Sequence, residues 1–242
     1  NDLSVTRKDY LSDQLQIVNA GGTVNQTSTG DATQYRRQSV VGRLSYQYDQ
    51  RYLMEFSFRR DGSTLFAEGK RFGFFPAVSA GWVISKEAFM SNAAAINYLK
   101  LRASYGELGN DQIGSYQYLS FYGFGPGVAM GTSGSFQNNI LLSRLANPDV
   151  TWETAKKTNV GLEATFLKDF SVEADYFIEK RRNILGQRSA TIPATIGTPA
   201  NVLPYENFQQ VDNKGFEIVL GYNKQLNDKL SIQSRISITH AE

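Results

Sequence analysis

The chain has 242 residues, a formal net charge of +2, one histidine and no cysteine. This length suffices for one large β domain, or two ordinary ones, with a buried core. The missing cysteine excludes disulfides and thiolate metal sites, and the single histidine excludes most histidine-based sites. The nearly balanced charge argues against nucleic acid as a partner.

The first elements predicted along the chain are a loop-rich lead-in and a β-hairpin. Residues 1–37 are polar and rich in turn formers, so we expect a weak strand and a loop there. The hairpin strands span residues 40–48 and 51–60, joined at Asp49 and Gln50. In the second strand, apolar side chains such as Met54 and Phe56 alternate with polar ones such as Glu55. A period of two predicts a strand, because successive side chains point to opposite faces.

The same alternation recurs through the rest of the chain. It predicts strands over residues 75–84, 98–108, 158–167, 170–180, 214–222 and 230–240. We also expect a helical turn near residues 87–90 and strand pieces near residues 116–122. Two long connections are expected at 109–157 and 183–213. The fold class is therefore all-β, with about eight to ten strands.

The connections between these strands alternate between short and long. Structureless loops above about 12–15 residues are uncommon in compact soluble domains, whereas outer-membrane barrels carry them on one rim. Strands of about 9–11 residues also fit a tilted crossing of a bilayer. Tyr and Phe side chains lie near strand ends, as in the aromatic girdles of membrane barrels. The pattern favours a section of an antiparallel, up-and-down transmembrane β-barrel, whose apolar face meets membrane lipid.

Two other interpretations remain open at this point. A β module for surface binding or adhesion, without transport, would bury the apolar face against a second sheet. A small self-closed barrel would pair its first and last predicted strands. No nucleophile elbow, phosphate loop or metal cluster is present in the sequence, so we expect neither an enzyme nor a cofactor.

The polar face and the long connections hold the candidate site residues. On the polar face, six charged residues are candidates for lining a substrate path through a lumen: Arg43, Glu55, Arg59, Arg102, Glu163 and Asp175. In the long connections, six aromatic residues are candidates for contacting cargo or a lid: Tyr116, Tyr118, Phe121, Tyr122, Phe124 and Trp152. Trp152 could stack on a sugar ring, or it could pack its own loop or anchor at an interface.

Six segments resemble the barrel of SusC/RagA-type TonB-linked outer-membrane transporters, in that family's order. They are YDQRYL (48–53) with RRDGST (59–64), GFFPA (73–77) with SAGW (79–82), LKLRASYG (99–106) with GN (109–110), NPDVTWE (147–153), NVGLE (159–163) and NKGFE (213–217). Each segment alone is weak, but the ordered set is specific and covers most of the chain.

The resemblance implies a 22-stranded barrel in the outer membrane of a Gram-negative bacterium. It also implies an N-terminal plug domain, energy supplied by the TonB complex through that plug, and a SusD-like surface lipoprotein as a lid. The implied cargo is an oligosaccharide first and a peptide second. The plug, the TonB box and a terminal aromatic strand are not recognised here, so we expect one middle-to-late section of such a barrel domain.

Overall fold

The computed structural model describes residues 2–6, 27–31, 34–125, 128–130, 135–137, 139–189, 193–197 and 199–242. The chain divides into two units, Asn1–Arg36 and Arg37–Glu242. In the first unit, β1 (Asp2–Thr6) pairs antiparallel with β2 (Thr27–Asp31). The remainder of the loop expected over 1–37 falls largely outside the described residues.

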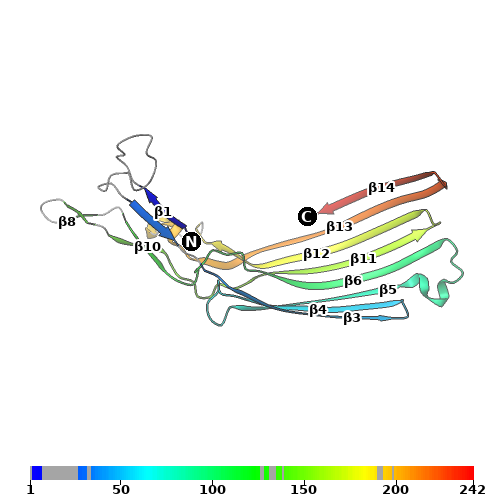
Figure 1. The fold of residues 1–242 in the computed structure, drawn as a ribbon, viewed down its shortest axis with the longest axis horizontal. Helices are drawn as coiled ribbons and strands as arrows, with labels where there is room; N and C mark the ends of the chain where they lie inside the picture. The colour runs from blue at the N-terminus through cyan, green and yellow to red at the C-terminus, as the bar shows by residue number, and fades with distance from the viewer. Residues whose placement is uncertain are drawn as a thin grey trace. The chain divides into compact units, whose positions relative to one another are not determined.

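The second unit is built on one eight-stranded antiparallel sheet. Its order is β3-β4-β5-β6-β11-β12-β13-β14, so each strand lies beside its neighbour in this sequence (Figure 1). The strands are β3 (Arg37–Tyr48), β4 (Tyr52–Ser63), β5 (Phe72–Val83), β6 (Ile96–Asn110), β11 (Glu153–Phe166), β12 (Phe170–Gln187), β13 (Tyr205–Asn227) and β14 (Leu230–Ala241).

Connections of different length lie at the two ends of this sheet (Figure 1). The short-turn rim carries the turns at 49–51, 167–169 and 228–229 and the connection 84–95, which contains the 3₁₀ helices η2 (Ile84–Lys86) and η3 (Ala88–Met90). The long-connection rim carries 64–71, 111–152 and 188–204. At the first hairpin, Asp49 and Gln50 adopt φ values of 48° and 52°. Positive φ at both positions is what a tight two-residue hairpin turn requires.

Several strands run further into the long connections than the sequence predicts. β12 continues to Gln187 and β13 begins at Tyr205, which shortens the expected connection 183–213 to 188–204. The pairing of these strands shifts register on both sides of Ile184, and Asn183 has a φ of 59°. Such an irregularity interrupts the two-residue alternation, which is why the pattern ended early.

In its described residues, the connection 111–152 contains four short strands. β7 (Phe121–Phe124) pairs with β10 (Ile140–Arg144), and β8 (Val128–Met130) pairs with β9 (Ser135–Gln137). Of the strand pieces expected near 116–122, the described structure begins β7 only at Phe121, because residues 115–118 form a turn.

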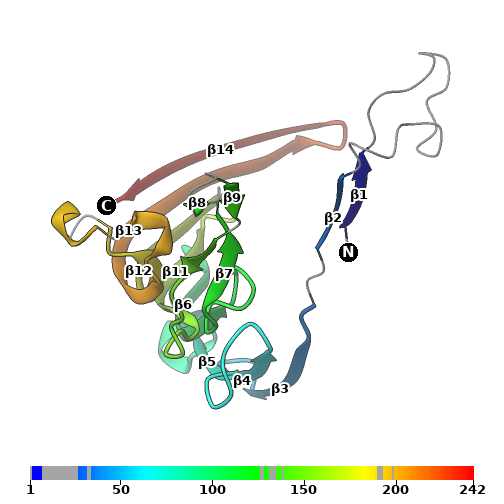
Figure 2. The same ribbon diagram turned by 90° about the vertical axis from the view of Figure 1, so that its left-hand side faces the viewer.

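The two faces of the eight-stranded sheet differ in composition. Its apolar face carries exposed side chains such as Leu44, Phe56, Val160 and Leu220, and within the described residues no second sheet covers them. The sheet is curved (Figure 2). Its other face, which we call the inner face, carries the charged partners of the alternation, which pair across neighbouring strands. An exposed apolar area of this extent is typical of a surface that meets lipid or another protein.

The first and last strands of the sheet stand apart. β3 and β14 occupy opposite edges and pair with only one neighbour each, so the sheet is open. The self-closed small barrel is therefore wrong for this chain. Among the described residues, no helix combines the length and apolar character needed to cross a bilayer.

Candidate functional site

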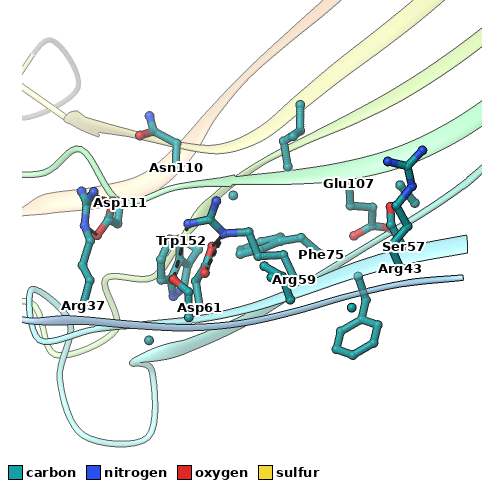
Figure 3. Close-up of a pocket in the computed structure, with 18 of the residues that line it drawn as sticks. Arg37, Arg43, Ser57, Arg59, Asp61, Phe75, Glu107, Asn110, Asp111 and Trp152 are labelled. Carbon is teal, nitrogen blue, oxygen red and sulfur yellow. Dashed lines mark hydrogen bonds and ion pairs between the residues drawn. The ribbon is translucent and has the colours of Figure 1, made fainter.

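A hollow of about 910 Å³ lies on the inner face, toward the long-connection rim (Figure 3). We call it the arginine hollow, because Arg37, Arg43 and Arg59 line it from β3 and β4. Strand alternation places these side chains on one face, since Arg37 and Arg43 lie an even number of residues apart and Arg59 is paired with Val41. Other lining groups come from β5, from β6 and the two residues that follow it, and from Trp152.

Two of these arginines are paired with aspartates that lie beneath them. Arg37 donates two hydrogen bonds to Asp111, from Nε to Oδ2 at 2.9 Å and from Nη2 to Oδ1 at 2.6 Å. Arg59 donates from Nε to both carboxylate oxygens of Asp61, at 2.7 and 2.5 Å. The Arg37 and Arg59 side chains are 54% and 59% exposed, whereas those of Asp111 and Asp61 are 8% and 12% exposed. The hollow therefore presents guanidinium groups to its interior.

Arg43 and Glu55 form a third pair on the same face. Arg43 donates from Nη2 to Glu55, which also accepts a hydrogen bond from Ser45 at 3.3 Å. Arg43 is the more exposed partner, at 69% against 34% for Glu55. In all three pairs, the arginine side chain is therefore more exposed than its acidic partner.

Arg102 joins three strands further toward the short-turn rim. From β6, its Nη2 donates to Asp175 Oδ2 on β12 at 2.6 Å, and its Nε lies 3.0 Å from Glu163 Oε1 on β11. The guanidinium passes over Gly161, where a Cβ atom would lie 2.8 Å from Arg102 Cζ and 2.5 Å from Asp175 Oδ1. Gly161 pairs with both Arg102 and Asp175 in the sheet register, so a side chain at this position would block the crossing.

A buried aromatic group, the Trp152 cluster, fixes the bases of the long connections. Phe66, Phe75, Val150 and Trp152 form it, and the Trp152 ring lies 5.1 Å from Phe66 and 5.4 Å from Phe75. Trp152 Nε1 also donates to the carbonyl of Arg71 at 3.2 Å. At 6% exposure, Trp152 packs its loop base, and this geometry supports the packing role rather than stacking on a sugar.

Hydrogen bonds from both side chains and the backbone join two of the long connections. Asn207 donates to the Thr151 carbonyl and accepts from the Thr151 amide, both at 2.9 Å. Asn147 donates to the Tyr205 carbonyl at 2.6 Å, and the Leu145 amide donates to Val202 at 2.9 Å. The connections 111–152 and 188–204 are therefore joined where they leave the sheet.

The other candidate loop aromatics lie on or next to β7. Phe124 is 82% exposed, and Tyr122 is also exposed. Arg144 lies over the Phe121 ring, with Cζ 4.6 Å from the ring centroid. The Phe121 ring centroid also lies 6.4 Å from that of Tyr116. Tyr118 is partly buried. Tyr122 and Phe124 are thus the members of the set that offer the most ring surface.

A polar group caps the aromatic residues of the short-turn rim. Glu87 Oε1 accepts hydrogen bonds from Tyr52 Oη at 2.6 Å and Trp82 Nε1 at 2.9 Å, and Arg51 Nη1 lies 3.2 Å from Oε2. These hydrogen bonds, first from Tyr52 and then from Trp82, hold the pKa of Glu87 below its ordinary value, and the Arg51 charge acts in the same direction. Tyr52 and Trp82 are paired in the sheet on its apolar face, as expected for an aromatic girdle.

The structure brings the six polar-face candidates into two groups. Arg43 and Arg59 line the arginine hollow and Glu55 pairs with Arg43, while Arg102, Glu163 and Asp175 form the three-strand contact. The sequence analysis missed Arg37, Asp61 and Asp111. Arg37 was assigned to the lead-in and Asp61 lies just beyond the predicted strand 51–60, although both continue the two-residue alternation of their strands. Asp111 follows the end of β6 and carries no such signal.

Comparison with known proteins gives a consistent result. Residues 3–240 match the family model described as TonB dependent receptor-like, beta-barrel. The chain is 31% identical over 236 residues to TonB-dependent receptor P39 of Formosa agariphila, covering 97% of this chain and 22% of that protein. It is 31% identical over 191 residues to TonB-dependent receptor SusC of Bacteroides thetaiotaomicron, covering 78% of this chain and 19% of SusC.

A solved structure agrees with this match at the level of the fold. The RagAB peptide importer in its closed-closed state superposes with a TM-score of 0.77 at 22% identity, covering 95% of this chain and 24% of that one. The chain spans about a fifth of the length of the curated relatives. Its eight-stranded sheet is accordingly one section of a larger antiparallel barrel wall. The chain belongs to the TonB dependent receptor-like, beta-barrel family.

Proposed function

We propose that the protein containing this chain imports a nutrient across the outer membrane of a Gram-negative bacterium, driven by the TonB complex. The observation that carries this proposal is the division of the sheet into an exposed apolar face and an inner face of paired charges, in a chain of the TonB receptor barrel family. A wall of this kind separates lipid from a polar passage. Import is passage rather than chemistry, so no catalytic group is needed.

The remaining parts of the import system are proposed from similarity. A SusD-like surface lipoprotein would act as a lid over the long-connection rim, and a plug would receive force from TonB. The similarity to SusC and to the RagAB fold supports this arrangement. The preferred cargo is an oligosaccharide, with a peptide as second choice. The six polar-face candidates would line the passage, and Tyr122 and Phe124 would contact the cargo or the lid.

Gene deletion tests the proposal directly. Cells lacking the gene should lose uptake of the cargo and regain it with the full-length gene, and deletion of tonB should abolish uptake equally. Purification of the tagged full-length protein from outer membranes in detergent should recover a lipoprotein in equal amount. A protein that leaves the cells without detergent, or uptake that is unchanged in the deletion strain, would contradict import and favour the adhesion alternative.

A further inference from the structure

We propose that the arginine hollow binds carboxylate groups of an acidic oligosaccharide, so that the cargo of this importer is a uronic-acid-type glycan rather than a neutral one. This inference rests on the proposed import function and adds a substrate class to it.

Burial determines which charge a ligand would meet first. In the two aspartate pairs, the carboxylates are about nine-tenths buried and the guanidinium groups are more than half exposed. Arg43 is likewise about twice as exposed as its partner Glu55. Although these pairs are electrically balanced, the surface of the hollow along β3 and β4 is cationic, because the anions there lie behind the cations.

The hydrogen bonds leave donors pointing away from the buried acids. Arg59 contacts Asp61 only through Nε, and its Nη2 donates one long bond of 3.4 Å to Ser39 Oγ. Within the described residues, Nη1 of Arg59 has no acceptor, and Arg43 contacts Glu55 only through Nη2. A guanidinium has five N–H donors and binds carboxylates through two parallel bonds. Asp61 therefore acts as a positioning group that holds Arg59 by its Nε (Figure 3) and leaves the outer edge of the guanidinium for a ligand.

Glu107 also lines the hollow, but its carboxylate accepts a hydrogen bond from Tyr105 Oη at 2.6 Å and lies 3.3 Å from Lys156 Nζ. The neutral polar groups of the hollow fit a sugar. Ser39 and Ser57 supply hydroxyl groups, and Asn110 and Gln112 supply amides. Such neutral donors and acceptors match the hydroxyl groups of a glycan, while the arginines match its acid group. The volume of about 910 Å³ lies within the usual range for ligand sites.

Binding measurements on the full-length protein in detergent test this assignment. The probes are trigalacturonic acid, its carboxyl-reduced trisaccharide, a Glu-rich peptide and the same peptide with Gln at each Glu. By calorimetry, we expect trigalacturonic acid to bind about tenfold more tightly than the reduced sugar, a difference typical of one good charge-assisted pair. The advantage should shrink as salt is raised, because the groups are partly exposed.

Variants connect that difference to the hollow. The double variant Arg43→Gln with Arg59→Gln should bind trigalacturonic acid no more tightly than the reduced sugar, with its affinity for the reduced sugar unchanged. Arg59→Lys keeps the charge but not the planar guanidinium, so it should lose part of the higher affinity for the acid. Arg235→Gln is the matched control, because Arg235 lies on β14 opposite Gly221 and outside the hollow. Heat-modifiability on gels verifies that each variant is folded.

Several outcomes would overturn the inference. Equal binding of the acid and reduced sugars, no binding of trigalacturonic acid at millimolar concentration, or an unaffected double variant would each do so. Charge-dependent binding of the peptide pair alone would replace the glycan with a peptide. Failure of import itself is distinguished by the deletion strain, since uptake that needs the gene but ignores acid groups refutes only this inference.

Discussion

Replacing Gly161 with alanine should break the contact that Arg102 makes across three strands. The new Cβ would lie 2.5 Å from Asp175 Oδ1 and 2.8 Å from Arg102 Cζ, both closer than a carbon atom tolerates. The ends of these side chains are flexible, so the backbone can stay in place while the guanidinium moves aside. The bond of 2.6 Å between Arg102 Nη2 and Asp175 Oδ2 is then lost.

The size of this effect follows from the burial of the pair. A hydrogen bond to a charged group contributes about 1.5–3 kcal/mol, and the lower end applies because Arg102 is 35% exposed. Alanine in place of glycine in a strand returns about 0.5–1 kcal/mol of backbone entropy. Gly161→Ala should therefore lower the free energy of unfolding by about 1 kcal/mol.

Gly81 provides a matched control for this variant. It pairs with Arg102 from the other side of β6, yet a Cβ there would lie 3.3 Å from its nearest neighbour, Leu53 Cδ1. Gly81→Ala should leave stability unchanged or raise it slightly. The assay is guanidinium unfolding of the full-length protein in lipid vesicles, followed by fluorescence, with both alanines repeated in an Arg102→Met background.

The Arg102→Met background tests whether Gly161→Ala acts through Arg102. If Gly161→Ala acts by displacing Arg102, its destabilising effect should disappear once Arg102 is methionine. An equal loss in both backgrounds would mean that the alanine strains the sheet itself. Equal effects of Gly81→Ala and Gly161→Ala would show that the guanidinium crossing contributes nothing.

Three further predictions concern other parts of the sheet. Trp152→Ala should destabilise the Trp152 cluster by about 3–5 kcal/mol and speed amide exchange in residues 64–71, measured by mass spectrometry; unchanged exchange there would contradict the packing role. Glu87→Gln should lower the free energy of unfolding at neutral pH, because the depressed pKa of Glu87 means that its ionised form stabilises the fold. As pH falls below the ordinary pKa of 4.5, the difference in stability between the variant and the parent should vanish. A difference that persists in acid would refute this role of Glu87. Ile236→Arg on the apolar face should destabilise the protein in vesicles by up to about 2–4 kcal/mol, whereas its neighbour Ser237→Arg on the inner face should be tolerated; equal effects would argue against a lipid-facing surface.

The two-residue alternation predicted most of the sheet. All eight long strands lie where the pattern indicates, and pairs such as Arg43 and Glu55 lie on one face because each strand keeps its phase. The alternation also separated the two faces correctly. It failed where backbone irregularity entered, as at Asn183, since a shift in register reverses the phase.

Contacts between residues far apart in the chain could not be predicted from the sequence. Phe66, Phe75 and Trp152 come from three separate segments, and no local pattern indicates that they meet. Asp111 was missed for the same reason, since it lies 74 positions from its partner Arg37. Which side of each ion pair faces outward depends on burial, which only the three-dimensional arrangement determines.

The strand order also has a consequence for how this section folds. Neighbouring strands of the sheet follow one another along the chain, and the longest connection, residues 111–152, separates β6 from β11. Two four-stranded meanders can therefore form early from local contacts, while their union needs closure of a long loop. The pairing of β7 with β10 shortens that loop before it closes. We expect the pairing of β6 with β11 to be the last to form, and the most sensitive to changes in the β7–β10 pair.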